Sequence, residues 1–250
     1  MLLTDKVCLI TGGTKGIGAA TALSYARQGA NVAIVGRNLQ DADAVRTIAQ
    51  LKETGRRTIA LRGDMSSPDD CRACVEQTAA KLGPVDVLVH SAGGPVPGGL
   101  FDIGPREWLG AFDVHVHAIF HLARAVVPAM KVKGEGAIIL ISSSAGKRAL
   151  RTNIAYQAVK GAIPHIARAL AFELADYNIR VNCVAPGVIR TAFHDSMPDS
   201  VKQNNLKNRI PLHREGTIEQ VASLILEMTT NDYITGETFS IDGGLTMRIC

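Results

Sequence analysis

Short runs of apolar, β-branched residues alternate with longer stretches of helical spacing from residue 7 to residue 241. Several of the short runs are continuously apolar, which is typical of strands in a parallel sheet with helices on both faces. Strand–helix alternation of this kind predicts an α/β fold built on a doubly wound sheet. We expect strands at 7–11, 31–35, 58–61, 85–89, 137–141, 179–184 and 238–241, and helices that include 16–28, 68–82 and 105–131.

Length and composition fit one domain of this type. The chain has 250 residues, of which 46% are hydrophobic and 20% charged, so it can bury a large core. No internal repeat or linker divides it, and we treat residues 1–250 as a single domain. We find no run of like charges, no segment near 18 consecutive apolar residues and no secretory signal pattern. We therefore expect a cytoplasmic protein without membrane or nucleic-acid partners.

The cysteines and paired histidines do not form a metal-site pattern. Cys71 and Cys74 have the spacing of a redox pair, but they fall in an expected helix and no second pair accompanies them. We interpret the five cysteines as packed or idle thiols. His117 and His121 are four residues apart on an expected helix without a third ligand close in sequence, so we expect no metal.

A glycine-rich turn, TGGTKGIG at 11–18, directly follows the first expected strand and opens a helix. Glycines let the backbone turn tightly and approach a pyrophosphate, and the helix N-terminus offers unpaired N–H groups and the positive end of the helix dipole. Such a turn can also be a simple tight connection, but its strand–turn–helix context favours a dinucleotide site. The residues expected to bind the cofactor here are Gly12, Thr14, Lys15, Gly16, Ile17 and Gly18.

The end of the second expected strand discriminates between the two nicotinamide cofactors. An acidic residue there would bind the ribose 2′-hydroxyl of NAD, whereas a basic residue suits the 2′-phosphate of NADP. The sequence has Arg37 and Asn38 at this point, no carboxylate before Asp41, and a second cation, Lys15, in the glycine turn. We therefore favour NADP(H) over NAD(H). The alternative is that both cations are solvated surface residues.

The third expected strand ends near the adenine side of this site. Asp64 is placed to accept a hydrogen bond from the adenine amino group, with Met65 against the ring. The alternative is that Asp64 caps the helix that follows.

Tyr156 and Lys160 are four residues apart, so on a helix they share one face, and Ser143 precedes the tyrosine in the segment ISSSA. A phenol with an ordinary pKa of about 10 is a poor proton-transfer group at neutral pH, and a neighbouring ammonium group lowers that pKa. The tyrosine then approaches the range useful for general acid–base catalysis. The spacing also arises by chance on helix surfaces, but the nucleotide turn upstream favours the catalytic interpretation.

Taken together, these motifs resemble the single-domain short-chain dehydrogenase/reductase family, and within it the 3-oxoacyl-acyl-carrier-protein reductases. The residues that carry the resemblance are the glycine turn, Asp64, Ser143, Tyr156, Lys160, the segment PGVIRT at 186–191 and IDGG at 241–244. The likeness covers residues 6–244, nearly the whole chain. It implies a doubly wound Rossmann fold with a seven-stranded parallel sheet in the order 3-2-1-4-5-6-7. It also implies a homotetramer built on the fourth and fifth helices and the last strand.

The resemblance implies hydride transfer that interconverts a ketone and a secondary alcohol. In reduction, Tyr156 would donate a proton to the carbonyl oxygen and Ser143 would hydrogen-bond that oxygen. Lys160 would lower the pKa of the phenol and bind the nicotinamide ribose. The other cofactor contacts that the resemblance implies are with Ser91, Ala92, Gly93, Tyr156, Pro186, Gly187, Ile189 and Thr191.

Two asparagines of the family pattern are absent. Its Asn-Asn-Ala-Gly segment reads HSAG at 90–93, where Ser91 still offers a hydroxyl. The fourth catalytic position, an asparagine that helps hold a water linking the lysine to solvent, is His115. Imidazole can donate, accept and change charge near neutral pH, so we hypothesise that His115 keeps a proton relay and alters the pH profile. The alternative is a histidine that only fills space.

Two further segments carry expectations about the site. Pro164 cannot donate a hydrogen bond to the carbonyl of Lys160, so we expect a kink just beyond the catalytic turn. Residues 187–216 form an irregular region that suggests a partly helical substrate lid. Residues 94–101 and 193–197 should line the substrate pocket.

Substrate class is the least constrained property. Lys147, Arg148 and Arg151 can attract an anionic substrate or an acidic carrier protein, or simply form a solvated basic loop. We expect reduction of a 3-oxoacyl thioester or a related carbonyl compound. The alternative is an NAD(P)-dependent sugar, polyol or other alcohol dehydrogenase. A remote alternative, suggested by the missing asparagines and opposed by the intact Ser143 and Tyr156, is a non-catalytic nucleotide-sensing protein.

Overall fold

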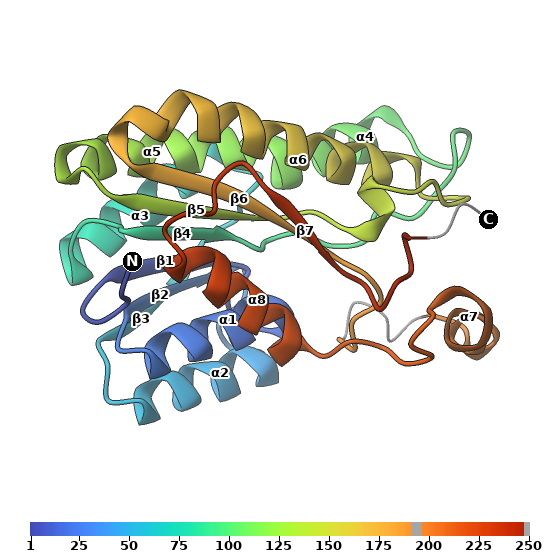
Figure 1. The fold of residues 1–250 in the computed structure, drawn as a ribbon, viewed down its shortest axis with the longest axis horizontal. Helices are drawn as coiled ribbons and strands as arrows, with labels where there is room; N and C mark the ends of the chain where they lie inside the picture. The colour runs from blue at the N-terminus through green and yellow to red at the C-terminus, as the bar shows by residue number, and fades with distance from the viewer. Residues whose placement is uncertain (192–196, 248–250) are drawn as a thin grey trace.

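The computed structural model describes residues 1–191 and 197–247, which form one seven-stranded parallel sheet (Figure 1). The strands are β1 (Val7–Thr11), β2 (Asn31–Gly36), β3 (Thr58–Arg62), β4 (Val87–His90), β5 (Gly136–Ile141), β6 (Ile179–Pro186) and β7 (Thr238–Ile241). Their order, β3-β2-β1-β4-β5-β6-β7, confirms the predicted doubly wound fold. The order reverses between β1 and β4, and sheets of this kind bind ligands at the carboxyl ends of the strands beside that reversal.

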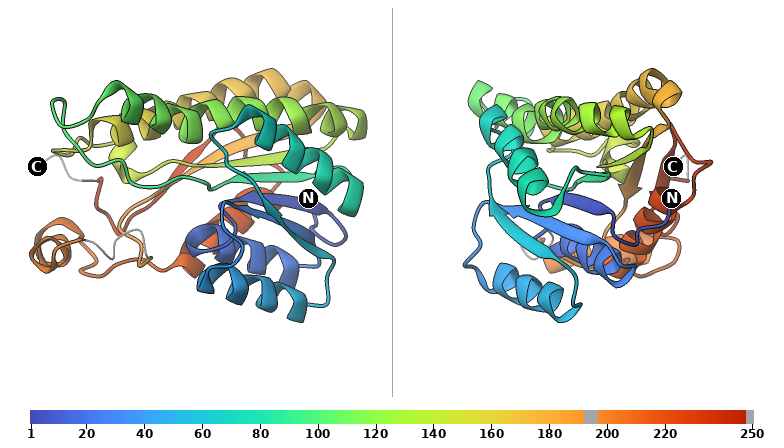
Figure 2. Two further views of the ribbon diagram at one scale, coloured as in Figure 1. Left: turned by 180° about the vertical axis from the view of Figure 1, so that it is seen from behind. Right: turned by 90° about the vertical axis from the view of Figure 1, so that its left-hand side faces the viewer.

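Helices cover both faces of the sheet (Figures 1 and 2). One layer contains α1 (Gly16–Arg27), α2 (Ala42–Glu53) and α8 (Ile218–Thr230), and the other contains α3 (Pro68–Leu82), α4 (Pro105–Phe112), α5 (Ala118–Lys133) and α6 (Ile154–Leu174). Side chains along each strand alternate between the two resulting cores. Leu9 of β1 packs with α3, α5 and α6, whereas Cys8 and Ile10 pack with α1, α2 and α8. Both faces of a strand are therefore buried, which explains the continuous apolar runs.

Side-chain caps fix where two helices beside the sheet begin. The Ser67 hydroxyl accepts a hydrogen bond from the backbone N–H of Asp70 (3.2 Å), and Pro68 is the first residue of α3. The Asp41 carboxylate accepts from the N–H of Ala44 (2.8 Å) at the start of α2. The first carboxylate after β2 is thus used as a helix cap.

A wider turn interrupts the helix that we expected at 105–131. α4 ends at Phe112, a π-helical turn, η1 (Asp113–His117), follows, and α5 begins at Ala118. A π turn inserts an extra residue into a helix and is frequent at functional sites. This one carries His115, whose side chain is buried.

The region at 187–216 is partly helical in its described part. It contains α7 (Asp199–Asn204) and a second π turn, η5 (Asn205–Arg209), and α7 stands beyond the ends of β6 and β7, away from both helical layers (Figure 1). Of the expected pocket residues at 193–197, only Met197 lies within the described residues. Across residues 1–191 and 197–247, none of the helices is long and apolar enough to cross a membrane.

Candidate active site

Ser143, Tyr156 and Lys160 meet at the carboxyl end of β5. Ser143 follows β5 in extended backbone and caps a short 3-10 turn, η2 (Ser144–Gly146), by accepting a hydrogen bond from the N–H of Ala145 (3.1 Å). Tyr156 and Lys160 lie in the first two turns of α6, with the lysine Nζ 5.7 Å from the centre of the tyrosine ring. The serine hydroxyl is hydrogen-bonded with the phenol, and the ammonium group lies beside the tyrosine ring.

Lys160 is buried, and its Nζ donates a hydrogen bond to the carbonyl oxygen of Ile141 (2.8 Å). Burial disfavours the charged ammonium and lowers the pKa of Lys160 to about 8. The lysine side chain thus spans from α6 to the last residue of β5.

The pKa of the Tyr156 phenol is raised, whereas we expected it to be lowered. Burial raises its pKa, and the hydrogen bond with Ser143 lowers it by a smaller amount. We expected the neighbouring ammonium to lower this pKa, but the loss of hydration has the larger effect in the structure.

His115 lies against the tyrosine. The two ring centroids are 6.0 Å apart and the rings meet edge to face, at 87°. His115 Nε2 lies 3.2 Å from the carbonyl oxygen of Gly94, so Nε2–H donates and Nδ1 carries a lone pair. Nδ1 is buried without a hydrogen-bond partner in the described part of the chain.

Burial, followed by the nearby Lys160 and His90, lowers the pKa of His115 to about 2. The imidazole therefore stays neutral at physiological pH. Our expectation that it changes charge near neutrality was wrong, because the side chain is enclosed by the core rather than by solvent.

His90 has a structural role that we did not predict. From the sequence we noted only that it stands where the family pattern has an asparagine. It ends β4, its Nε2–H donates to the carbonyl oxygen of Val114 (3.0 Å), and its Nδ1 accepts from the Thr11 hydroxyl (2.8 Å). The same hydroxyl oxygen accepts from the N–H of Ala92 (3.3 Å). Burial lowers the pKa of His90 to about 4, so it links β1, β4 and the π turn as a neutral group. The sequence signal was a histidine at the end of a buried strand.

The glycine turn after β1 has the shape of a phosphate cradle. Gly12 has φ +64°, and a Cβ there would lie 2.7 Å from the backbone nitrogen of Ala92. A Cβ on Gly18 would lie 2.3 Å from the carbonyl oxygen of Gly12. α1 begins here with no side-chain hydrogen bond from its N-cap, Lys15, and no acidic residue in its first turn. Its first N–H groups thus face the turn as an anion site requires.

Asp64 and Met65 are the two residues that we expected beside the adenine ring. The Asp64 carboxylate accepts from the N–H and hydroxyl of Ser66 (2.9 and 2.8 Å), and these bonds, with Arg37 nearby, lower its pKa. Asp64 does not cap α3, because Ser67 does so. The Met65 side chain is buried and lies beside Cys71, and its contact with an adenine ring stays a prediction.

Residues after β6 reach the same cradle from the other side. Thr191 lies next to the glycine turn, since a Cβ on Gly16 would be 3.7 Å from its methyl group. Ile189 pairs with Gly216 in an isolated bridge, and Gly187 packs against Asp242 so closely that a Cβ would lie 2.7 Å away.

The remaining predicted cofactor residues lie at this edge of the sheet or beside it. Pro186 ends β6, Ser91 and Ala92 follow β4, and Asn38 follows β2. Ile17 lies in the first turn of α1. Thr14 is buried against Gly36, and Gly93 (φ +148°) packs on the His115 ring.

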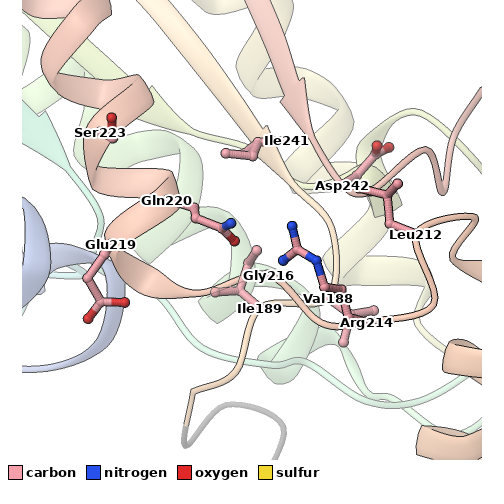
Figure 3. Close-up of a pocket in the computed structure, with 11 residues that line it drawn as sticks. Val188, Ile189, Leu212, Arg214, Gly216, Glu219, Gln220, Ser223, Ile241 and Asp242 are labelled. Atoms are coloured by element: carbon pink, nitrogen blue, oxygen red, sulfur yellow. The ribbon is translucent and has the colours of Figure 1, made fainter.

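A pocket of about 490 Å³ opens beside Ile189 (Figure 3). Arg214, Gln220 and Asp242 border it, whereas Ser143, Tyr156 and Lys160 do not. The pocket thus adjoins the segment after β6 rather than the serine, tyrosine and lysine.

Two loops beside the tyrosine are tied together. The N–H of Gly98 donates to the carbonyl oxygen of Thr152 (3.0 Å), and the N–H of Ile154 donates to Gly98 (3.1 Å). The Gln157 side chain accepts from the N–H of Leu150 (2.7 Å) and donates to its carbonyl oxygen (2.8 Å). The expected pocket loop at 94–101 is therefore held against the segment that precedes Tyr156.

The other side chains singled out from the sequence have ordinary partners. The Lys147 Nζ donates to the Ser240 hydroxyl (2.7 Å), while Arg148 and Arg151 are exposed. His117 pairs with Asp113, and His121 lies against Phe120. Cys8, Cys71, Cys74 and Cys183 are buried free thiols.

Comparisons with known proteins agree with this arrangement. The family model described as "Enoyl-(Acyl carrier protein) reductase" matches residues 12–246. The chain is 36% identical over 247 residues to the 3-oxoacyl-[acyl-carrier-protein] reductase FabG of Chlamydia trachomatis, which covers 98% of both chains. It is 37% identical over 246 residues to the glucose 1-dehydrogenase of Gluconobacter oxydans, covering 97% of this chain and 92% of that one. The crystal structure of L-sorbose reductase from Gluconobacter frateurii with NADPH and L-sorbose superposes over the full length of both chains, with a TM-score of 0.91 and 28% identity.

Proposed function

This chain belongs to the short-chain dehydrogenase/reductase family, and from that premise we propose that it is an NADP(H)-dependent reductase of a 3-oxoacyl thioester or a related carbonyl compound. As a member it is an oxidoreductase that interconverts a carbonyl group and an alcohol. The observation that carries the proposal is the convergence of Ser143, Tyr156 and Lys160 beside the glycine turn.

The residues of the cradle fit a dinucleotide. Gly12 and Gly18 stand where a Cβ would collide with the backbone, and the uncapped N-terminus of α1 suits a pyrophosphate. Arg37 and Lys15 would hold a 2′-phosphate, and Thr191 with the backbone of Ile189 would hold the nicotinamide carboxamide. A bound nicotinamide cofactor would supply the hydride.

In the proposed reduction, Tyr156 donates its phenolic proton to the carbonyl oxygen of the substrate. Ser143 donates a second hydrogen bond to that oxygen and so orients it. Lys160 holds a positive charge beside the phenol as the tyrosine loses its proton, and this favours the phenolate that forms. His115 stays neutral against the tyrosine ring, and in the proposed relay with Lys160 its unpartnered Nδ1 would accept a hydrogen bond.

NADP(H) is preferred in this proposal because Arg37 directly follows β2, Lys15 lies in the glycine turn, and the sequence has no carboxylate between β2 and Asp41. Asp41, the first acid there, is used as the cap of α2. A similar protein of known structure is complexed with NADPH, which supports the same choice.

A second candidate substrate class is a sugar or polyol. It is favoured by the likeness to a glucose 1-dehydrogenase and to a reductase crystallised with L-sorbose, both close in length to this chain.

On the same family basis we propose a cytoplasmic homotetramer. In this proposal the region at 187–216 acts as a substrate lid, and the basic side chains at 147–151 contact an acidic carrier protein.

The test is a screen of 3-oxoacyl thioesters, ketones, sugars and polyols, run in both directions with each of the two cofactors. We expect turnover of a 3-oxoacyl substrate with NADPH, and a loss of at least about a thousandfold in kcat for Tyr156→Phe, since proton transfer and the oxygen contact are both removed. An Arg37→Ala control should raise the KM for NADPH and leave the KM for NADH nearly unchanged. Binding of NADPH without turnover of any substrate would favour the nucleotide-sensing alternative.

A further inference from the structure

The main-chain carbonyl of Lys160 has lost its ordinary helical partner. In an α-helix this oxygen would accept a hydrogen bond from the N–H of residue 164. Residue 164 is a proline, which has no N–H, and its ring crowds the same carbonyl. α6 nevertheless continues without interruption from Ile154 to Leu174. A buried carbonyl left without a donor would destabilise the helix at the turn that carries the lysine.

The hydroxyl of Ser142 replaces the missing donor. Its Oγ lies 2.6 Å from the carbonyl oxygen of Lys160, and the contact is buried. Ser142 is itself fixed to the sheet, because its backbone N–H donates to the carbonyl oxygen of Val184 in β6 (2.8 Å). A Cβ on Gly146 would lie 2.4 Å from the same Lys160 oxygen, so this glycine lets the segment approach α6.

Lys160 is consequently held at both ends by two consecutive residues. Its side-chain Nζ donates to the carbonyl oxygen of Ile141, and its main-chain oxygen accepts from the Ser142 side chain. The next residue is Ser143. The hydrogen bonds therefore fix the distance between the segment carrying the reactive serine and the helix carrying the tyrosine and lysine.

We infer that Ser142 is a positioning residue for the proposed reaction. Its hydroxyl donates to the carbonyl oxygen of Lys160 the hydrogen bond that Pro164, which has no N–H, cannot donate. The kinetic part of this inference rests on the proposed function. The hydrogen-bonding part does not, and it is testable on the purified protein without a substrate.

The first measurement is a double-mutant cycle of thermal stability with Ser142→Ala, Pro164→Ala and the pair. An alanine at 164 restores the helical N–H. Ser142→Ala should therefore lower the melting temperature by about 3 to 8 °C in the natural background, and by less than about 2 °C beside Pro164→Ala. An equal loss in the two backgrounds would overturn the inference, whether or not the protein turns over any substrate.

The second measurement applies the same cycle to steady-state kinetics. Ser142→Ala should lower kcat by about tenfold while KM for the cofactor changes little, because alignment of the reacting groups is lost and binding is not. Adding Pro164→Ala should recover most of that loss. A purely structural role would show the thermal coupling with an unchanged kcat, and that result would refute the positioning role.

Two matched controls separate this contact from general effects. Ser144→Ala removes a hydroxyl two residues further along the same segment and should change neither the melting temperature nor kcat appreciably. Pro128→Ala restores a helical N–H in α5, which also contains an internal proline. Pro128→Ala should not diminish the losses of melting temperature and kcat caused by Ser142→Ala. If it diminishes them as strongly as Pro164→Ala does, the inference fails.

Discussion

At the scale of single residues, burial governs the ionisation of the candidate site. It lowers the pKa of Lys160 to about 8, that of His90 to about 4 and that of His115 to about 2, and it raises that of Tyr156. Both histidines are thereby neutral, and Lys160 is the group that titrates nearest to physiological pH.

The pKa of Lys160 has a consequence for stability. Because it falls from 10.5 to about 8 on folding, the unfolded chain holds a proton between these pH values that the folded chain has released. The free energy of unfolding therefore rises with pH across this window. Relative to Lys160→Met, the natural protein should gain about 3 kcal/mol between pH 7.5 and pH 10.5, measured by urea unfolding. Parallel pH curves for the two proteins would contradict this.

The residue types of the site were predictable from sequence, whereas their ionisation was not. The spacing of Tyr156 and Lys160 fixes their common helix face, and the glycine pattern fixes the turn. The environments of His115 and Met65 depend on how η1 and α3 pack, and those contacts join residues distant along the chain. Burial therefore overturned the two expectations about ionisation, those for Tyr156 and His115.

At the scale of elements, one buried arginine anchors α8 to the sheet. Arg180 of β6 donates from Nη1 to the carbonyl oxygens of Met228 (2.8 Å) and Ile234 (3.0 Å), and from Nη2 to that of Thr229. Met228 and Thr229 lie in the last turn of α8, where carbonyls lack helical donors and a cation is favourable.

Arg180→Met should leave these buried carbonyls without donors and destabilise the protein by about 3 to 5 kcal/mol, a fall of roughly 6 to 15 °C in melting temperature. The matched control is Arg46→Met, which breaks only an exposed pair with Asp43 and should cost under about 1 kcal/mol. Calorimetry on both variants compares them directly. Similar melting temperatures for the two would show that α8 is not held by Arg180.

Element boundaries were predictable where the signal is local. α3 begins at Pro68 as expected, because its cap and proline are adjacent in sequence. β4 begins at Val87 rather than at residue 85. The Asp86 side chain is used instead to accept a hydrogen bond from the N–H of Val7 (2.8 Å), a partner 79 residues away. The π turn at 113–117 likewise had no local signal.

At the scale of the whole molecule, two of the areas with exposed large apolar side chains lie on the elements that we expect at subunit interfaces. On the outer helices, Phe172 of α6 is 90% exposed and Phe120 of α5 is 57% exposed. Near the edge strand, Tyr233 is 97% exposed and Phe239 of β7 is partly exposed. A tetramer with two kinds of interface would bury side chains on both of these areas, and that is the assembly that we propose.

The tetramer that we propose should therefore dissociate stepwise. Phe172→Glu places a charge on the α5–α6 face, and burying it between subunits is unfavourable, so we expect dimers held by the β7 side instead of tetramers. Light scattering after size-exclusion chromatography distinguishes the two masses. Phe101→Glu changes an equally exposed aromatic residue in the loop before α4, outside both areas, and should stay tetrameric. An unchanged mass for Phe172→Glu, or a monomeric natural protein, would exclude the α5–α6 face as an interface.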